Sequence, residues 1–152
     1  MMTNCNVFRY VTTLVLSSVL TLSSVAVYGQ EKPYTEGSVW SVTLVRVKPG
    51  MFDVYMRDVL PLRKKINEQA KKQGLLVSSH VFSGPATGKD DFDVMFMDEY
   101  KNWAAYDGIA AKYDAIALQV IGAEEKQVQM STKRLDIREI VGNKNMQELI
   151  IK

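Results

Sequence analysis

The stretch LLVSSHVFSGPATGKDDFDVMFMDEY, residues 75–100, decides what kind of fold the chain adopts. Its centre is similar to a phosphate-binding loop, which has four residues between its glycines, then Lys and Ser or Thr, and leads into a helix. Here three residues separate Gly84 from Gly88, Asp90 follows the lysine, and the next segment is apolar and strand-like. The Gly, Pro and Asp residues instead predict a hairpin connection between two strands, and nucleotide binding is not expected.

Apolar periodicity outside this stretch predicts the remaining elements. Strands are expected at residues 39–47, 75–83 and 91–100, and helices at residues 51–73 and 102–121. The first strand consists of β-branched and bulky residues with few polar breaks, which is typical of a strand buried on both faces. Pro61 lies inside the first helix, and because proline has no N–H, a kink or break is expected there.

The segment 123–141 fits two structures. Its second part, RLDIREIV, alternates like a strand, but it also continues a helix that starts with AEEKQVQMSTK. The helix is preferred, because Gly142-Asn143 is a typical C-terminal stop and MQELIIK, residues 146–152, can still form a last strand.

The resulting order of elements, β-α-β-β-α-(α)-β, is the split β-α-β or ferredoxin-like plan. The predicted class is α+β, with a four-stranded antiparallel sheet and helices on one face only. Because the strands are apolar on both faces, the uncovered face is not expected to meet water. A second copy packed sheet to sheet would cover it, so the sequence predicts a homodimer.

The first 29 residues are typical of a signal peptide. Arg9 is their only charge, and a long, uncharged, apolar run follows it and ends in small residues. Cleavage is expected after Gly29, which would remove Cys5 and leave a periplasmic or secreted chain without thiols. The alternative is a retained membrane anchor, since about 20 residues can span a bilayer. After cleavage, a polar leader is expected at residues 30–37 and the folded domain at residues 38–152.

Composition excludes several kinds of site. The formal net charge of +2 is too weak to indicate nucleic acid or an acidic membrane as a partner. Cys5 is the only cysteine and His80 the only histidine, which excludes a disulfide framework, a thiolate metal cluster and a multi-histidine metal site. No metal and no cofactor is therefore assigned.

Side-chain alternation groups the candidate site residues along three strands. The groups are Trp40, Val42, Leu44 and Arg46, then Leu76, Ser78, His80 and Phe82, and then Val94, Phe96, Asp98 and Tyr100. The candidate ligand contacts among them are Trp40, Arg46, His80 and Phe96. Arg46 is a rim charge or a buried anion partner, and His80 is a structural hydrogen-bonding residue or a general base. Asp98 is an exposed strand end, a paired carboxylate or a protonated group.

Three stretches carry a resemblance to a known superfamily: VTLVRVKPGMFDVYM (42–56), DEYKNWAAYDG (98–108) and REIVGNKNMQELIIK (138–152). They resemble small exported bacterial proteins of the dimeric α/β-barrel superfamily, which also holds stress-responsive barrel proteins and antibiotic-biosynthesis-type monooxygenases. The resemblance implies a homodimer whose two sheets close a barrel, sometimes with an internal cavity. The matching residues are architectural, and the exported subgroup has no established activity, so no catalytic residue is transferred.

Three functions are consistent with these features. The preferred one is a binding or assembly module that encloses a small apolar or aromatic molecule. The second is a cofactor-independent, monooxygenase-like enzyme, in which His80, Asp98 or Tyr100 would deprotonate an electron-rich substrate. The third is a haem-binding protein with His80 as axial ligand. Whether His80 points into the barrel separates the first from the other two.

Overall fold

The computed structural model describes residues 31–152, and the predicted signal peptide lies outside the described residues. The strands are β1 (Tyr34–Val47), β2 (Ser78–Ser83), β3 (Val94–Tyr100) and β4 (Arg138–Ile151), and the helices are α2 (Phe52–Lys72), the 3-10 helix η1 (Trp103–Tyr106), α3 (Ile109–Ile121) and α4 (Glu124–Leu135). Within residues 31–152, no helix has both the length and the apolar character that crossing a membrane requires.

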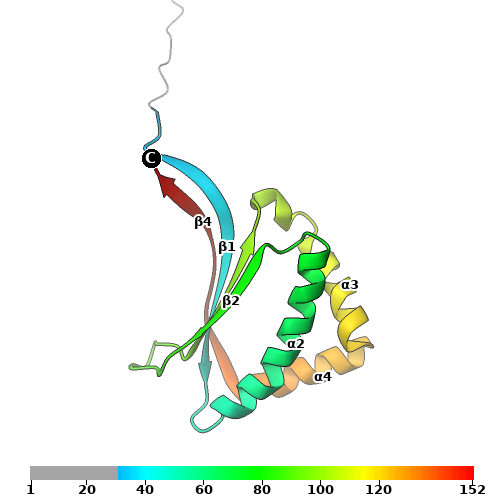
Figure 1. Ribbon diagram of the computed structural model, residues 1–152. Coiled ribbons are helices and arrows are strands. Elements are labelled where there is room, and N and C mark those ends of the chain that lie inside the picture. Colours follow the sequence, from blue (N-terminus) through cyan, green and yellow to red (C-terminus); the bar gives the residue numbers. More distant parts are fainter. Residues whose placement is uncertain (1–30) are drawn as a thin grey trace, which may run out of the picture. The chain divides into compact units, whose positions relative to one another are not determined.

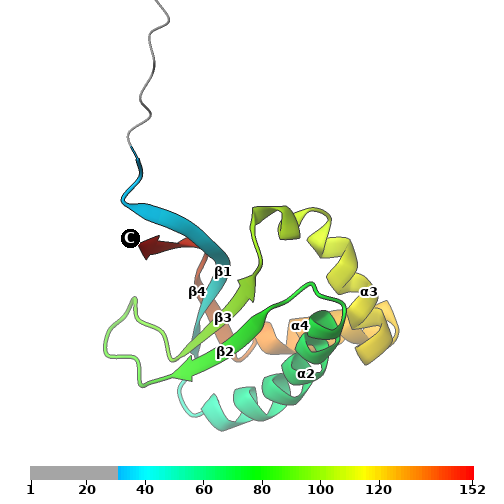
Figure 2. The same cartoon turned by 45° about the horizontal axis from the view of Figure 1, so that its top comes forward.

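The four strands form one antiparallel sheet in the order β2-β3-β1-β4. Figure 1 shows α2, α3 and α4 together on one side of this sheet, and the turned view in Figure 2 shows the same arrangement. This is the predicted α+β, ferredoxin-like fold. The antiparallel pairing of β2 with β3, from Ser78↔Glu99 to Ser83↔Val94, confirms the predicted hairpin connection.

Two groups of buried side chains hold the helices against the sheet. The first contains Val45, Val47, Tyr55, Val59, Val94, Phe96 and Ile137, and the second contains Ala70, Leu76, Tyr100 and Ile116. Each group combines residues on or beside the strands with residues of α2. The apolar stripe of α2 therefore lies along the sheet and links both parts of the core.

The last strand is much longer than predicted. The helix preferred for residues 123–141 is correct only as far as Leu135, where α4 ends, and β4 already begins at Arg138. The reason is tertiary: β1 pairs with β3 on one side, and β4 satisfies its backbone groups on the other. Gly142, predicted as a helix stop, instead follows a register shift in β4.

The sequence predicts a kink or break at Pro61, and the structure shows no break, since α2 runs continuously from Phe52 to Lys72. A proline at this position leaves the carbonyl of Arg57 without its intrahelical donor. Both residues are exposed, so water can satisfy that carbonyl on the outer side of α2.

The helix predicted for residues 102–121 is divided into two. Asn102 accepts a hydrogen bond from the backbone N–H of Ala105 at 3.2 Å and thereby caps η1. Gly108 then adopts a left-handed conformation with φ of +63°, and α3 begins after it. This conformation is accessible to glycine at little cost, and it ends one helical segment before the next.

β1 begins at Tyr34, inside the segment predicted as a polar leader. The early start follows from pairing with the end of β4, since Tyr34 lies opposite Ile151 and Glu36 opposite Leu149. Figure 1 shows these two strand ends side by side as they lead away from the helices. The predicted last strand is thus confirmed as part of β4, but Leu149, Ile150 and Ile151 are 53%, 52% and 86% exposed in the single chain.

Candidate functional site

Side chains alternate between the two faces of the sheet, so each strand contributes to two different surfaces. Val45, Val94 and Phe96 face the helices, where they pack against α2. We call the opposite surface the open face, because α2, α3 and α4 all lie on the other side (Figure 1). Strand register places on it Trp40, Val42, Leu44, Ser78, His80, Phe82, Met95, Met97 and Met146.

His80 lies on the open face between two aromatic side chains. Its ring centroid is 6.0 Å from that of Trp40 and 6.3 Å from that of Phe82, and the His80 and Phe82 rings are stacked. His80 is exposed in the single chain. The structure therefore brings together two of the predicted ligand contacts, Trp40 and His80, on the face that a second copy could cover.

The sheet separates His80 from its expected catalytic partners. Asp98 and Tyr100 share the helix-facing side with Phe96, since these three alternate along β3 and Phe96 and Tyr100 belong to the helix-side core. His80 cannot be oriented by Asp98 or Tyr100 across the sheet. The predicted ligand contact Phe96 is likewise on the opposite side from Trp40.

Arg46, the remaining predicted ligand contact, holds the connection between β2 and β3. Its Nε donates to the carbonyl oxygen of Asp91 at 2.9 Å, and its Nη2 donates to the same oxygen. The guanidinium of Arg46 is thus occupied by the protein's own backbone.

Two carboxylates of the β2–β3 connection accept hydrogen bonds from its own backbone. Asp91 Oδ2 accepts from the Thr87 backbone N–H at 2.8 Å, and Asp93 Oδ1 accepts from that of Ala86 at 3.2 Å. The backbone hydrogen bonds from Thr87 and Phe92 are the main reason that the pKa of Asp91 is lowered. The backbone N–H groups of Ala86 and Thr87 are therefore bonded within the segment.

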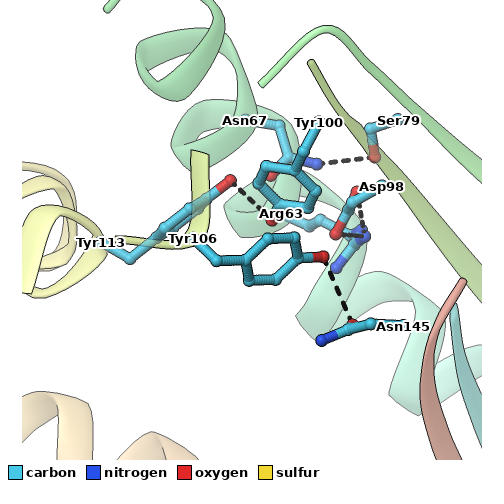
Figure 3. A network of polar contacts seen from close by, with 8 residues as sticks. All are labelled: Arg63, Asn67, Ser79, Asp98, Tyr100, Tyr106, Tyr113 and Asn145. Atoms are coloured by element: carbon cyan, nitrogen blue, oxygen red, sulfur yellow. Dashed lines mark hydrogen bonds and ion pairs between the residues drawn. The ribbon is translucent and has the colours of Figure 1, made fainter. Parts of the chain in front are cut away.

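A polar network occupies the helix-facing side, and Figure 3 shows it from close by. Arg63 of α2 donates from Nη2 to both oxygens of Asp98, at 2.6 Å each. Its guanidinium carbon also lies 4.4 Å from the centroid of the Phe96 ring. Asp98 is thus a paired carboxylate, with its side chain 18% exposed.

Three tyrosines extend this network (Figure 3). The hydroxyl groups of Tyr100 and Tyr113 are 3.3 Å apart, and the Tyr106 hydroxyl donates to Asn145 Oδ1 at 3.3 Å. Burial, followed by the hydrogen bond with Tyr113, raises the pKa of Tyr100 far above its ordinary value. Tyr100 therefore stays protonated near neutrality, which argues against its predicted role as a proton acceptor.

A pocket of about 210 Å³ opens beside the network. Its lining residues come from α2, β3, α3 and α4: Val59, Leu62, Arg63, Ile66, Asn67, Asp98, Tyr113 and Arg134. A shallower depression of about 430 Å³ runs between α2 and β2 and shares Arg63 and Asn67 with it. Asn67, which lines both depressions, donates a hydrogen bond to Ser79 Oγ at 2.8 Å, and Ser79 lines the shallower one.

Sequence reasoning missed Arg63, although a signal for it was present. Arg63 falls four residues after Val59 and three before Ile66, which places a charge on the apolar side of a helix. Such a residue must find a partner when the helix docks. Tyr113 falls on the apolar stripe of the helix predicted for residues 102–121, which indicated a core residue, and the spacing around Arg134 gave no signal of a site.

The described residues contain no cluster of metal-ligating side chains. Within residues 31–152, His, Cys, Asp and Glu side chains nowhere gather in a group of three or more with suitable geometry. The donors that the structure does bring together are guanidinium, hydroxyl and amide groups, which favour hydrogen bonding to an organic or anionic ligand.

Comparison with known proteins finds similarity among solved structures only. No protein-family model and no curated protein matches the chain. A dimeric ferredoxin-like protein from an uncultured marine organism is 14% identical with a TM-score of 0.48, and the match covers 78% of this chain and 98% of that one. A dimeric protein of unknown function and ferredoxin-like fold from Bacteroides fragilis NCTC 9343 is 10% identical with a TM-score of 0.40, covering 78% of this chain and 100% of that one.

Proposed function

We propose that the protein is a homodimeric binding protein, in which two sheets pack open face to open face around a small apolar or aromatic molecule. The observation that carries this proposal is the composition of the open face, where aromatic, aliphatic and methionine side chains predominate. Phe82 and Met146, at opposite edges of the sheet, are still 51% and 40% exposed in the single chain. Contiguous apolar surfaces of this kind mark sites of association.

The distribution of polar groups on this surface supports the same arrangement. Arg46 lies at the end of β1 opposite Glu139 of β4, and Glu99 accepts a hydrogen bond from Ser78 Oγ at 2.6 Å. Lys144, opposite Val42, is a further charged residue of the open face and lies on the edge strand β4, so the charged groups lie at strand ends or at the sheet edge, around the apolar centre. An apolar centre with a polar rim is the usual organisation of a protein interface.

The ligand part of the proposal rests on the aromatic row. Trp40 of β1 lies beside His80 of β2, and Phe82 follows two residues later on β2, with ring-centroid separations of 6.0 and 6.3 Å. Flat rings in a row provide stacking surface for a planar molecule held between two sheets. Methionines beside them can adapt to its shape, because the thioether side chain is flexible and polarizable.

An enzymatic function receives less support from the geometry. A general base on the open face would have to be His80 without Asp98 or Tyr100, because the sheet lies between them. Haem ligation by His80 would place the cofactor between the Trp40 and Phe82 rings that already flank the imidazole. Both alternatives depend on His80 alone.

A charge introduced on the open face tests the proposal. Phe82→Glu is expected to convert the dimer into a folded monomer, because Phe82 is exposed in the protomer and would be desolvated only in the dimer. Leu118→Glu on α3 is the matched control, since Leu118 is 58% exposed on the helical side. Light scattering gives the mass, and circular dichroism confirms folding.

The ligand is tested with a neutral probe, N-phenyl-1-naphthylamine, whose fluorescence increases in an apolar site. We expect binding to the unaltered protein and to Leu118→Glu, and loss of binding with Phe82→Glu. A folded, monomeric unaltered protein at micromolar concentration would refute the dimer. Equal probe binding by the Phe82→Glu monomer would refute an enclosed site between the sheets.

A further inference from the structure

The pocket beside the polar network lies on the other side of the sheet from the proposed dimer contact. Its residues come from α2, β3, α3 and α4, so it is complete within one protomer. One wall is aliphatic, formed by Val59, Leu62 and Ile66 of α2. The other is polar and includes Tyr113 and Arg134. This combination suits a molecule that has an apolar body and one polar end.

Positive charge exceeds negative charge around this pocket. Arg63 and Asp98 neutralise each other, because one guanidinium nitrogen contacts both carboxylate oxygens. Arg134 is partly buried, and within residues 31–152 no carboxylate forms an ion pair with it. Asp58 is near enough to affect Arg134, but it pairs with Lys133 at 3.5 Å. Arg134 therefore presents uncompensated positive charge to the pocket.

Arg138 adds to this positive potential from the start of β4. Burial raises the pKa of the Tyr55 phenol, and the positive charges of Arg138, Arg134 and Arg63 each oppose that rise. All three guanidinium groups are therefore close enough to the Tyr55 hydroxyl to affect it electrostatically. The Nε atoms of Arg63 and Arg138 are buried and have no hydrogen-bond partner among the described residues. Buried, unpaired guanidinium N–H groups favour a negatively charged acceptor.

We propose that this pocket binds a small organic monocarboxylate, with its carboxylate on Arg134 and its apolar part against Val59, Leu62 and Ile66. A guanidinium presents two parallel N–H groups that match the geometry of a carboxylate. The pocket volume of about 210 Å³ is below the roughly 300–1,000 Å³ of sites for drug-sized ligands. The ligand class is therefore a compact aromatic or branched aliphatic acid. This site is independent of the molecule proposed to lie between the sheets.

Calorimetric titration with benzoate tests the site, and benzamide serves as the uncharged probe of the same shape. Benzoate is expected to bind saturably, and benzamide at least roughly tenfold more weakly, because its amide has neither the negative charge nor the second acceptor oxygen of the carboxylate. Arg134→Gln removes the charge and should weaken benzoate binding by a similar factor. Lys126→Gln is the control, because Lys126 is an exposed cation on the same helix, α4, and does not line the pocket.

Several results would overturn the proposal. Failure of benzoate to bind the unaltered protein, equal binding of benzamide, or unchanged binding by a folded Arg134→Gln would each do so. If Arg134→Gln does not fold, Arg134→Lys replaces it: this variant retains the charge and should bind benzoate with intermediate affinity. The monomeric Phe82→Glu variant should still bind benzoate normally. If Phe82→Glu loses benzoate binding while Arg134→Gln retains it, the site lies at the dimer interface, and the assignment to this pocket is contradicted.

Discussion

Arg63 and Asp98 are 35 residues apart in the chain, yet Arg63 Nη2 lies 2.6 Å from both oxygens of the Asp98 carboxylate. This contact joins the middle of α2 to an inner strand of the sheet, over the ring of Phe96. The two side chains are only 22% and 18% exposed. Each group is thus held in a partly desolvated position that requires its partner.

Removing one member of this pair should cost stability. We expect Arg63→Ala or Asp98→Ala to lower the free energy of unfolding by about 2–3 kcal/mol, somewhat less than for a fully buried pair. Lys64 and Glu68 are the comparison, since they are 3.9 Å apart with side chains 77% and 55% exposed, and their coupling should be about 0.3–0.5 kcal/mol. Urea unfolding of the single and double variants of each pair measures the loss of stability and the coupling energy. Equal coupling energies for Arg63–Asp98 and Lys64–Glu68 would contradict the prediction.

Backbone conformation alone should determine the effect of two glycine substitutions. A Cβ at Gly108 or at Gly88 would meet no atom within 4 Å, but only Gly108 has a left-handed φ, at +63°. We expect Gly108→Ala to destabilise the protein by about 1–2 kcal/mol and Gly88→Ala to change stability by less than about 0.5 kcal/mol. Thermal or urea unfolding of the two variants distinguishes them. Equal losses of stability in the two variants would show that a side chain at position 108 does not strain the left-handed backbone conformation there.

The end of β4 should contribute more to the dimer than to the protomer. Leu149, Ile150 and Ile151 pair with β1 through the backbone, but their side chains remain at least half exposed. Deleting residues 146–152 is therefore expected to reduce dimerisation while the helix-side core still folds. Light scattering and far-ultraviolet circular dichroism separate the two effects. A complete loss of structure would mean that this strand end is essential for the protomer.

His80 is expected to have a structural role on the open face. His80→Gln should preserve dimerisation and binding of the neutral probe, because its planar amide still fills the place between Trp40 and Phe82. His80→Ala should weaken probe binding, because it leaves no planar side chain there. Both variants and the unaltered protein are assayed for turnover of electron-rich phenols and for a haem absorption band. Turnover or a haem band that appears with the unaltered protein and is lost in both variants would favour the enzyme or haem alternative.

Export is proposed on the pattern of residues 1–29 and can be measured directly. The mass of the protein from the envelope fraction of its native cells should correspond to cleavage after Ala26 or Gly29. Arg9→Glu should slow processing, because the positive charge before the apolar run is removed. A full-length product that remains in the membrane would support the retained anchor instead.

The sequence by itself determined the features that depend on neighbouring residues. Apolar periodicity indicated α2 and the strands, and Gly, Pro and Asp between residues 83 and 91 indicated a hairpin, because turn chemistry acts over a few residues. Alternation also identified which residues share a face within β1 and β3, but it wrongly grouped Leu76 with His80 and Phe82, since Leu76 precedes β2 and packs in the helix-side core. From the order of elements, the ferredoxin-like plan and its uncovered sheet face followed.

Only the tertiary structure decided how these pieces face one another. Residues 138–141 form a strand because β1 offers them a partner, although the same residues also fit a helical pattern. Alternation could not show that His80 and Asp98 lie on opposite faces, since that depends on the register between β2 and β3. The pairing of Arg63 with Asp98 and the approach of Arg134 to the pocket depend on where α2 and α4 dock. Register and docking are set by contacts between distant segments, and no local pattern in the chain specifies them.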